Sequence, residues 1–317
     1  MTPAVKEGVR AIGFMALLSA VLLAALVHLV PGDPVKTILG PRASPEMSAR
    51  VRAEMGLDDP ISVQIISFVT GALRGDLGKD FVSQQPVTKL IGMALPHTII
   101  LALVGLGLAV ILGVPLGVYA ASHPDTWIDR FTGVLSVSFI TLPAYVAGLL
   151  LLLLFSVRLR SLPAIGVGDL SDPLDYISHL ILPASALAIL WVGYLARLVR
   201  ASVLEVLTMN YIRTAYAFGL RERVIFYKLA LKNAIIPTIA VLGVGMGSLL
   251  GGAIFIEVIF TRPGLGRLIY DAIAARNYPI VRGGVLVTTV LFVLANLVAD
   301  LSYYVLDPRI REEGATR

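Results

Sequence analysis

The sequence predicts an all-α integral membrane protein with six transmembrane helices. Of its 317 residues, 57% are hydrophobic and only 15% are charged, whereas soluble domains carry about 25% charged residues. Six apolar runs are long enough to cross a bilayer as helices, which takes about 20 residues. These runs cover residues 11–30, 95–121, 131–157, 180–196, 235–260 and 283–304.

The first run, residues 11–30, follows Lys6 and Arg10 and has two readings. A cleaved signal peptide has an apolar core of about 7–15 residues and a small-x-small cleavage site. This run is longer, and the sequence VPGDP at residues 30–34 offers no such site. We therefore expect a retained transmembrane helix, with the N-terminus and this helix occupying residues 1–30.

The second region, residues 31–92, is too long for a simple connector, and we expect an external segment here. Ser44, Pro45 and Glu46 form a helix start, with a capping hydroxyl, a proline at the first helical position and an acid in the first turn. That helix should run to about Met55, and a second amphipathic stretch covers residues 61–73. The segment either caps the outer mouth of the bundle or docks a soluble partner, and the two roles are compatible.

The remaining spans form a predicted transmembrane core at residues 93–304, followed by a tail at 305–317. Six leucines at residues 149–154 strongly favour insertion of the third run. With six spans both termini share one side, and residues 197–232 carry seven Lys or Arg against two Glu. The positive-inside rule then places both termini in the cytoplasm, although basic residues also occur on the other side. Arg197 and Arg200 are expected to extend to the inner interface.

The basic loop at residues 208–234 is the most informative part of the sequence. Ala215, Ala217 and Phe218 offer a small apolar helical surface, Gly219 breaks the helix, and a charged helix follows. Such a helix–Gly–helix element can insert into a groove on a partner and transmit a rigid-body movement. Alternatively, it is an interfacial amphipathic helix anchored by basic side chains.

This loop resembles the EAA loop of ABC-importer permeases, in the version found in the dipeptide, oligopeptide and nickel group. Residues 211–220 read YIRTAYAFGL, against a group pattern close to YVRTARAKGL. Arg213 and Thr214 stand where the general consensus has Glu and Ala, and Lys232 stands at the usual proline. The resemblance assigns coupling to partner ATPases to Tyr211, Arg213, Thr214, Ala215, Ala217, Gly219, Leu220 and Arg223.

Shorter motifs extend the resemblance over residues 10–311. PGDP, GLDDP, GDLG and QPV in the external segment, and RPGLGRL, NYP and DPRIR near the end, are similar to the first permease subunit of that group. The resemblance implies ABC type I importer architecture in a bacterial inner membrane. It also implies a homologous second permease, two cytoplasmic ATPases that bind ATP and Mg²⁺, and an external solute-binding protein.

Several residues within the spans are candidates for packing or for the transport pathway. Small residues allow helices to approach closely, and the glycines predicted to mark static packing or a moving interface are Gly113, Gly117, Gly243, Gly247 and Gly251. Glu257 suggests an ion pair with an external arginine or a pathway contact, and Asn296 with Asp300 suggests an interhelical contact or a pathway position.

The composition argues against other classes of function. The chain has no cysteine, and its four histidines lie far apart, so we expect no metal site. No phosphate loop and no catalytic motif occurs, so we expect no catalytic residue and no cofactor in this chain. The basic residues alternate with apolar runs, which favours the lipid bilayer over nucleic acid as a partner.

The sequence therefore predicts a permease subunit that imports peptides or related small solutes. Two alternatives remain open at this point. One is an ABC importer subunit for nickel or another non-peptide solute, and the other is a self-contained, ion-coupled secondary transporter that works without partner subunits. The sequence does not identify the substrate.

Overall fold

The computed structural model describes residues 59–306, together with the isolated positions Gly13, Phe14, Leu18, Ser44–Glu46, Ala49 and Arg52. Apart from those positions, the predicted first span at 11–30, the first part of the external segment and the tail from residue 307 lie outside the described residues. Pro45, Glu46, Ala49 and Arg52 are helical and Ser44 is not, in agreement with the predicted helix start.

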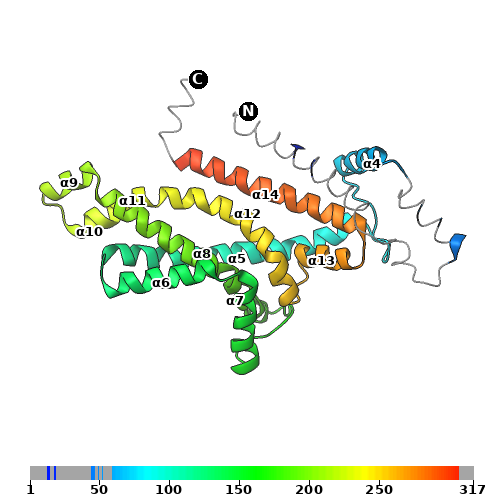
Figure 1. The fold of residues 1–317 in the computed structure, drawn as a ribbon, viewed down its shortest axis with the longest axis horizontal. Helices are drawn as coiled ribbons and strands as arrows, with labels where there is room; N and C mark the ends of the chain where they lie inside the picture. The colour runs from blue at the N-terminus through cyan, green and yellow to red at the C-terminus, as the bar shows by residue number, and fades with distance from the viewer. Residues whose placement is uncertain are drawn as a thin grey trace, which may run out of the picture. The chain divides into compact units, whose positions relative to one another are not determined.

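The described chain is helical throughout, apart from loops and one isolated β-bridge between Lys79 and Pro86. Its elements are seen in chain order in Figure 1. They are α4 (Ile61–Leu73), α5 (Val87–Ser122), α6 (Trp127–Thr141), α7 (Ala144–Leu151), the π-helical η1 (Leu152–Arg158), α8 (Pro173–Leu207), α9 (Asn210–Ala217), α10 (Glu222–Val224), the π-helical η2 (Ile225–Ala230), α11 (Leu231–Ala234), α12 (Ile236–Ile259), α13 (Leu265–Ala274) and α14 (Tyr278–Leu306).

In the described residues, four helices are long and apolar enough to cross a membrane, or five if one bent pair counts as a single span. Helices α5, α8 and α14 contain the runs predicted at 95–121, 180–196 and 283–304. The run at 235–260 matches α12, although the candidate span here covers Glu222–Gly243 and is followed by the shorter apolar helix Gly245–Ile259. The all-α membrane fold is confirmed, whereas the described residues do not establish six spans.

The run at 131–157, predicted as one continuous span, is broken in the structure. It is a pair of helices, α6 and α7 with η1, whose axes differ by 103°. Proline lacks the N–H that a helix interior needs, and it pushes the preceding residue out of the α region. Leu142 accordingly has φ −83° and ψ 113° before Pro143. The run is long and apolar enough for one span, and the sequence analysis therefore did not predict the break at Pro143.

The chain divides into two compact units. One comprises Met1–Thr98 with Arg262–Val293, and the other comprises Ile99–Thr261 with Leu294–Arg317. The first unit has a core built by the start of α5, by α13 and by the start of α14. Its buried members are Val87, Ile91, Leu265, Ile269, Ala272, Ile280 and Val281. The Leu265 amide at the start of α13 donates a 2.7 Å hydrogen bond to the Thr98 hydroxyl.

In the first unit, Asp80 fastens the end of the external segment to the corner between α13 and α14. Its buried carboxylate accepts hydrogen bonds from the amides of Val82 (3.1 Å) and Ser83 (2.9 Å), from the Ser83 hydroxyl and from the Asn277 side-chain amide. Gly78 has φ +85°, and a Cβ built on it would lie 3.7 Å from Pro279. The GDLG and NYP motifs, far apart in sequence, therefore meet.

The second unit is organised around α8. A Cβ on Gly193 of α8 would lie 2.5 Å from the Ser136 carbonyl oxygen of α6. Cβ atoms on Gly113 and Gly117 of α5 would lie 2.9 and 2.5 Å from α8 carbonyl oxygens. Real Cβ atoms do not approach backbone so closely, so these glycines let the helices pack backbone to backbone.

We expect Gly117→Ala to destabilise the second unit by about 1–3 kcal/mol, because the added methyl group overpacks the α5–α8 contact. Gly133→Ala is the matched control, because nothing lies within 4 Å of a Cβ at that α6 position. The control should be neutral or stabilise by up to about 1 kcal/mol. Denaturant unfolding of the purified protein measures both, and equal midpoints for the two variants would contradict the packing assignment.

We also expect Asp80→Asn to destabilise the first unit by about 1–3 kcal/mol, because a buried acceptor of several hydrogen bonds is lost. Burial of Asp80 disfavours its charged form, but the hydrogen bonds from Ser83, Val82 and Asn277 outweigh burial and lower its pKa. The ionised carboxylate therefore stabilises the fold above the ordinary pKa of about 3.9, and this contribution fades as the pH falls below that value.

Urea unfolding at neutral and acidic pH tests this expectation. The difference between wild type and Asp80→Asn should shrink in acid. The exposed Asp76→Asn is the control, and it should change stability by no more than about 0.5 kcal/mol. A difference that stays constant with pH would contradict the role given to the Asp80 carboxylate.

Candidate functional site

The predicted helix–Gly–helix element is present between α8 and α12. Helix α9 ends in a Schellman motif, in which the Gly219 amide donates to the Tyr216 carbonyl oxygen (2.9 Å) and the Leu220 amide donates to the Ala215 carbonyl oxygen (3.2 Å). Gly219 has φ +71°, and nothing lies within 4 Å of a Cβ built on it. Glycine is thus needed here for its backbone conformation and not for lack of space.

One face of α9 is anchored on α8. Ile212 and Ala215 are buried in a cluster with residues of α8, η2 and neighbouring helices. The other buried members of this cluster are Ala121, Val199, Val203, Val206, Ile225, Ala230 and Ala234. Ala215 therefore belongs to the core, which corrects the expectation that it shares one surface with the exposed Ala217 and Phe218. Because the two helices share this cluster, a displacement of α9 should also displace α8.

The opposite face of the element is an exposed aromatic and basic surface, which we call the loop surface. Phe218 is its most exposed large apolar residue, at 81%. Its other exposed members are Tyr211, Arg213, Thr214, Tyr216, Ala217, Leu220, Arg221, Arg223, Tyr227 and Lys228. Tyr211 is held in place by the Asn233 side-chain amide, which donates to its hydroxyl (2.9 Å). An apolar patch with a basic rim is typical of a protein interaction site.

A bidentate ion pair ties α8 to α6 in the turn that precedes Val203. The Arg200 guanidinium binds both carboxylate oxygens of Asp129, and the Nη2–Oδ2 distance is 2.6 Å. Asp129 is buried, so Arg200 does not simply extend to the membrane interface as expected. The sequence analysis missed this pair. Its only local signal was the order Thr126-x-x-Asp129, which resembles a capping box at the start of α6.

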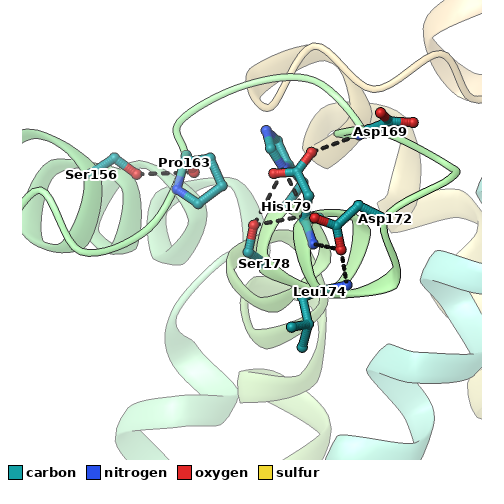
Figure 2. Close-up of polar contacts among 8 residues, drawn as sticks. Ser156, Pro163, Asp169, Asp172, Leu174, Ser178 and His179 are labelled. Atoms are coloured by element: carbon teal, nitrogen blue, oxygen red, sulfur yellow. Dashed lines mark hydrogen bonds and ion pairs between the residues drawn. The ribbon is translucent and has the colours of Figure 1, made fainter.

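The other end of α8 is fixed by a polar cluster, shown in Figure 2. Asp172 caps the helix by accepting a 3.0 Å hydrogen bond from the Leu174 amide. The Asp175 carboxylate accepts the Asp169 amide at 2.6 Å and lies 3.3 Å from Nδ1 of His179. The Ser171 hydroxyl and amide hold the pKa of Asp169 below its usual range. The loop before α8 is therefore tied down by α8 itself.

The glycines predicted on α12 have different surroundings. Gly251 is exposed with nothing within 4 Å of a Cβ, whereas Gly247 is buried and Gly243 is partly buried. The close approach of α12 to α8 occurs instead at Gly245, where a Cβ would lie 2.8 Å from the Trp191 ring. The structure therefore leaves Gly251 available to a partner and uses Gly245 for packing.

The three polar pathway candidates lie on two helices, with Glu257 on α12 and both Asn296 and Asp300 on α14. Glu257 is fully buried in α12 and Asn296 is partly buried in α14. The side chain of Asp300 lies outside the described residues. The ion pair between Glu257 and an external arginine, and the contact between Asn296 and Asp300, stay predictions. Among the residues that the structure describes, no three His, Asp or Glu side chains are placed to share a metal ion.

Comparison with known families decides what this chain is. Residues 113–312 match the family described as "Binding-protein-dependent transport system inner membrane component", and residues 4–102 match its N-terminal family. The chain belongs to this family of ABC-importer permeases. It is a multi-pass inner-membrane permease that works with an ATPase and a binding protein, as the resemblance in the loop implied.

Relatives of this permease match it over almost its whole length. A protein of Brucella abortus (strain 2308), named for a peptide transport system permease, is 41% identical over 309 residues, which are 96% of this chain and 98% of the relative. The glutathione transport system permease protein GsiC of Salmonella typhimurium (strain LT2) is 39% identical over 295 residues, 93% of this chain and 94% of GsiC.

Solved structures show the same fold. A chain of the MetNI methionine ABC transporter, in an inward-facing conformation, is similar with a TM-score of 0.58 at 17% sequence identity. The match covers 69% of this permease and 96% of that chain. The predicted importer-permease architecture is therefore confirmed.

We expect the Asp129–Arg200 pair of this permease to show a coupling energy of about 0.5–3 kcal/mol in a double-mutant cycle. The cycle compares Asp129→Ala, Arg200→Ala and the double variant by urea unfolding. Arg197→Ala, on the exposed side of α8, replaces Arg200→Ala in the control cycle and should be additive with Asp129→Ala. Additivity of the Asp129 and Arg200 variants would contradict the pairing.

Proposed function

We propose that this permease imports peptides or related small solutes, and that it forms the ATP-driven pathway together with a homologous second permease. The relatives support the substrate class, since one is named for peptide transport and another for transport of glutathione, itself a tripeptide. Both match nearly the whole of this chain, 96% and 93% of it. The N-terminal family matches residues 4–102, which include the external segment before α5.

The loop surface is the proposed contact with a cytoplasmic ATPase. The single observation that carries this assignment is the two-sided construction of α9. Ile212 and Ala215 fix one face on α8, while Phe218 projects from the following turn into solvent. A partner that binds Phe218 would therefore displace a helix packed against α8, and not a flexible loop.

The movement has a continuous physical route into the bundle. Ile212 and Ala215 of α9 share a buried apolar cluster with Val199, Val203 and Val206 of α8. One turn away, Arg200 joins α8 to Asp129 at the start of α6. Packed cores and bidentate ion pairs resist deformation, so a push at the loop surface should shift α8 and α6 together.

We extend the same proposal to the rest of the assembly. The loop surface and both termini face the cytoplasm, and residues 31–92 face the solute-binding protein outside. ATP and Mg²⁺ bind to two ATPase subunits, and this chain contributes no catalytic residue. The permease core is residues 93–304, with the coupling loop at 208–234 and a cytoplasmic tail at 305–317.

We expect Gly219→Pro to abolish uptake while leaving membrane insertion intact. Proline cannot adopt φ +71°, and it removes the amide that donates to Tyr216. Uptake of a labelled dipeptide and the amount of protein in isolated membranes are measured in parallel. Gly133→Ala serves as the control for a glycine substitution. Normal uptake by Gly219→Pro would overturn the coupling assignment.

We expect Phe218→Asp to lose the ATPase during purification in mild detergent, because a charge replaces the apolar centre of the loop surface. Leu170→Asp is the matched control, since Leu170 is 70% exposed in the loop before α8, at the other end of that helix from the loop surface. The control should retain the ATPase. Loss of ATPase from both variants, or from neither, would contradict the proposed contact.

Recovery of the assembly also separates this proposal from a self-contained secondary transporter. A second permease and ATPases should purify with the wild-type chain, and transport in vesicles should require ATP. Ion-driven transport by the chain alone would overturn the proposal.

A further inference from the structure

Helix α4 has an unusual distribution of polar and apolar side chains. Its 13 residues, ISVQIISFVTGAL, contain no charge. Gln64 is the one buried residue of α4. The apolar Val63, Ile66 and Leu73 are 46%, 62% and 83% exposed. Ile65, Phe68 and Val69 are partly buried, so α4 is apolar on most sides. A surface helix of a soluble domain instead carries polar and charged residues on its outward face.

Apart from Ile61 at the start of α4, the exposed apolar residues form one stripe, which also contains Thr70. Val63, Ile66, Thr70 and Leu73 follow at intervals of three, four and three residues, which places them on one face of a helix. The Thr70 hydroxyl donates to the Ile66 carbonyl oxygen (2.7 Å) and so needs no water. The exposed Ser62 and Ser67 lie beside this stripe, which we call the α4 stripe.

The inward face of α4 locates the helix relative to a membrane span. Gln64 accepts a hydrogen bond from Nη2 of Arg282 at 3.2 Å and donates to the Asp59 carbonyl oxygen at 3.0 Å. Arg282 lies one turn into α14, whose candidate span begins at Tyr278. The helix is therefore held beside the membrane-entry end of α14.

The length of α4 rules out a crossing. Thirteen residues of helix extend about 20 Å, against about 30 Å for the hydrocarbon core. An apolar helix of 10–14 residues outside a soluble core is typically interfacial or re-entrant. Asp59 and Arg74, which flank α4, would then lie near the headgroups while the stripe faces acyl chains.

From this geometry we propose that α4 lies along the membrane interface and inserts the α4 stripe into the lipid leaflet at the Tyr278 end of α14. A protein partner is less suited to this face, because protein interfaces carry about one hydrogen bond per 100–200 Å² and the Thr70 hydroxyl already donates its proton within α4. The inference rests on the membrane location of the family and is independent of the proposed substrate. It makes part of the external segment a membrane anchor in addition to a docking region.

The absence of cysteine from the chain permits a direct test with single spin labels. Ile66→Cys and Leu73→Cys place the label on the stripe, and the exposed Lys79→Cys places it beyond α4 as an aqueous reference. The labelled transporter, with its partner subunits, is reconstituted in nanodiscs of phosphatidylethanolamine and phosphatidylglycerol. Collision rates are then measured with oxygen, which concentrates in lipid, and with nickel-EDDA, which stays in water.

We expect oxygen collisions to exceed nickel-EDDA collisions at Ile66 and Leu73, and the order to reverse at Lys79. Higher nickel-EDDA collisions at both stripe positions would place α4 in water and overturn the proposal. Low collision rates with both reagents would also overturn it, because they would show that another protein segment covers the stripe. Two labelled positions guard against a local distortion by either label.

Discussion

The close packing of α8 against its neighbours is the constraint on which the second unit depends. Two thirds of its apolar window is buried (67%), against 24–28% for the other three unbroken candidate spans. Glycines at the contacts with α5 and α6 bring those helices to backbone distance from α8, and Gly245 of α12 packs against the Trp191 ring. A single added methyl group would collide at each of these contacts. In a membrane the hydrophobic effect does not drive helices together, so this close van der Waals contact has to hold them.

Because α8 is held along its length, its two ends can be given different tasks. At one end, Asp172 and Asp175 order the preceding loop through short local hydrogen bonds. At the other, the apolar cluster below α9 and the Asp129–Arg200 pair join the loop surface to the bundle. The same helix thus connects an ordered loop with the element proposed to receive ATPase movement.

The first unit uses polar contacts in a comparable way. Asp80 binds Asn277, and Gln64 binds Arg282, so two parts of the external segment are fastened to the region around the start of α14. Buried polar groups are costly unless their hydrogen bonds are satisfied. These contacts therefore specify where the external segment docks, while apolar residues such as Ile66 are left for the surroundings to cover.

The sequence by itself determined the membrane class, the positions of α5, α8 and α14, and the helix–Gly–helix element with Gly219 at its break. These features depend on the apolar length of a run or on backbone preferences within a few residues, and both can be predicted from a short stretch of sequence. The 103° bend at Pro143 was also encoded locally, but the length of the apolar run hid it.

Only the tertiary structure decided which face of α9 is buried, which glycines pack, and which polar residues pair. Asp129 and Arg200 are 71 residues apart, and Asp80 and Asn277 are 197 apart. The sequence near each residue does not predict its partner, because the pairing depends on the rotation of each helix about its axis and on the path of the chain between the two residues. For the same reason Ala215 could be assigned to the coupling element from the sequence, but not to its buried side.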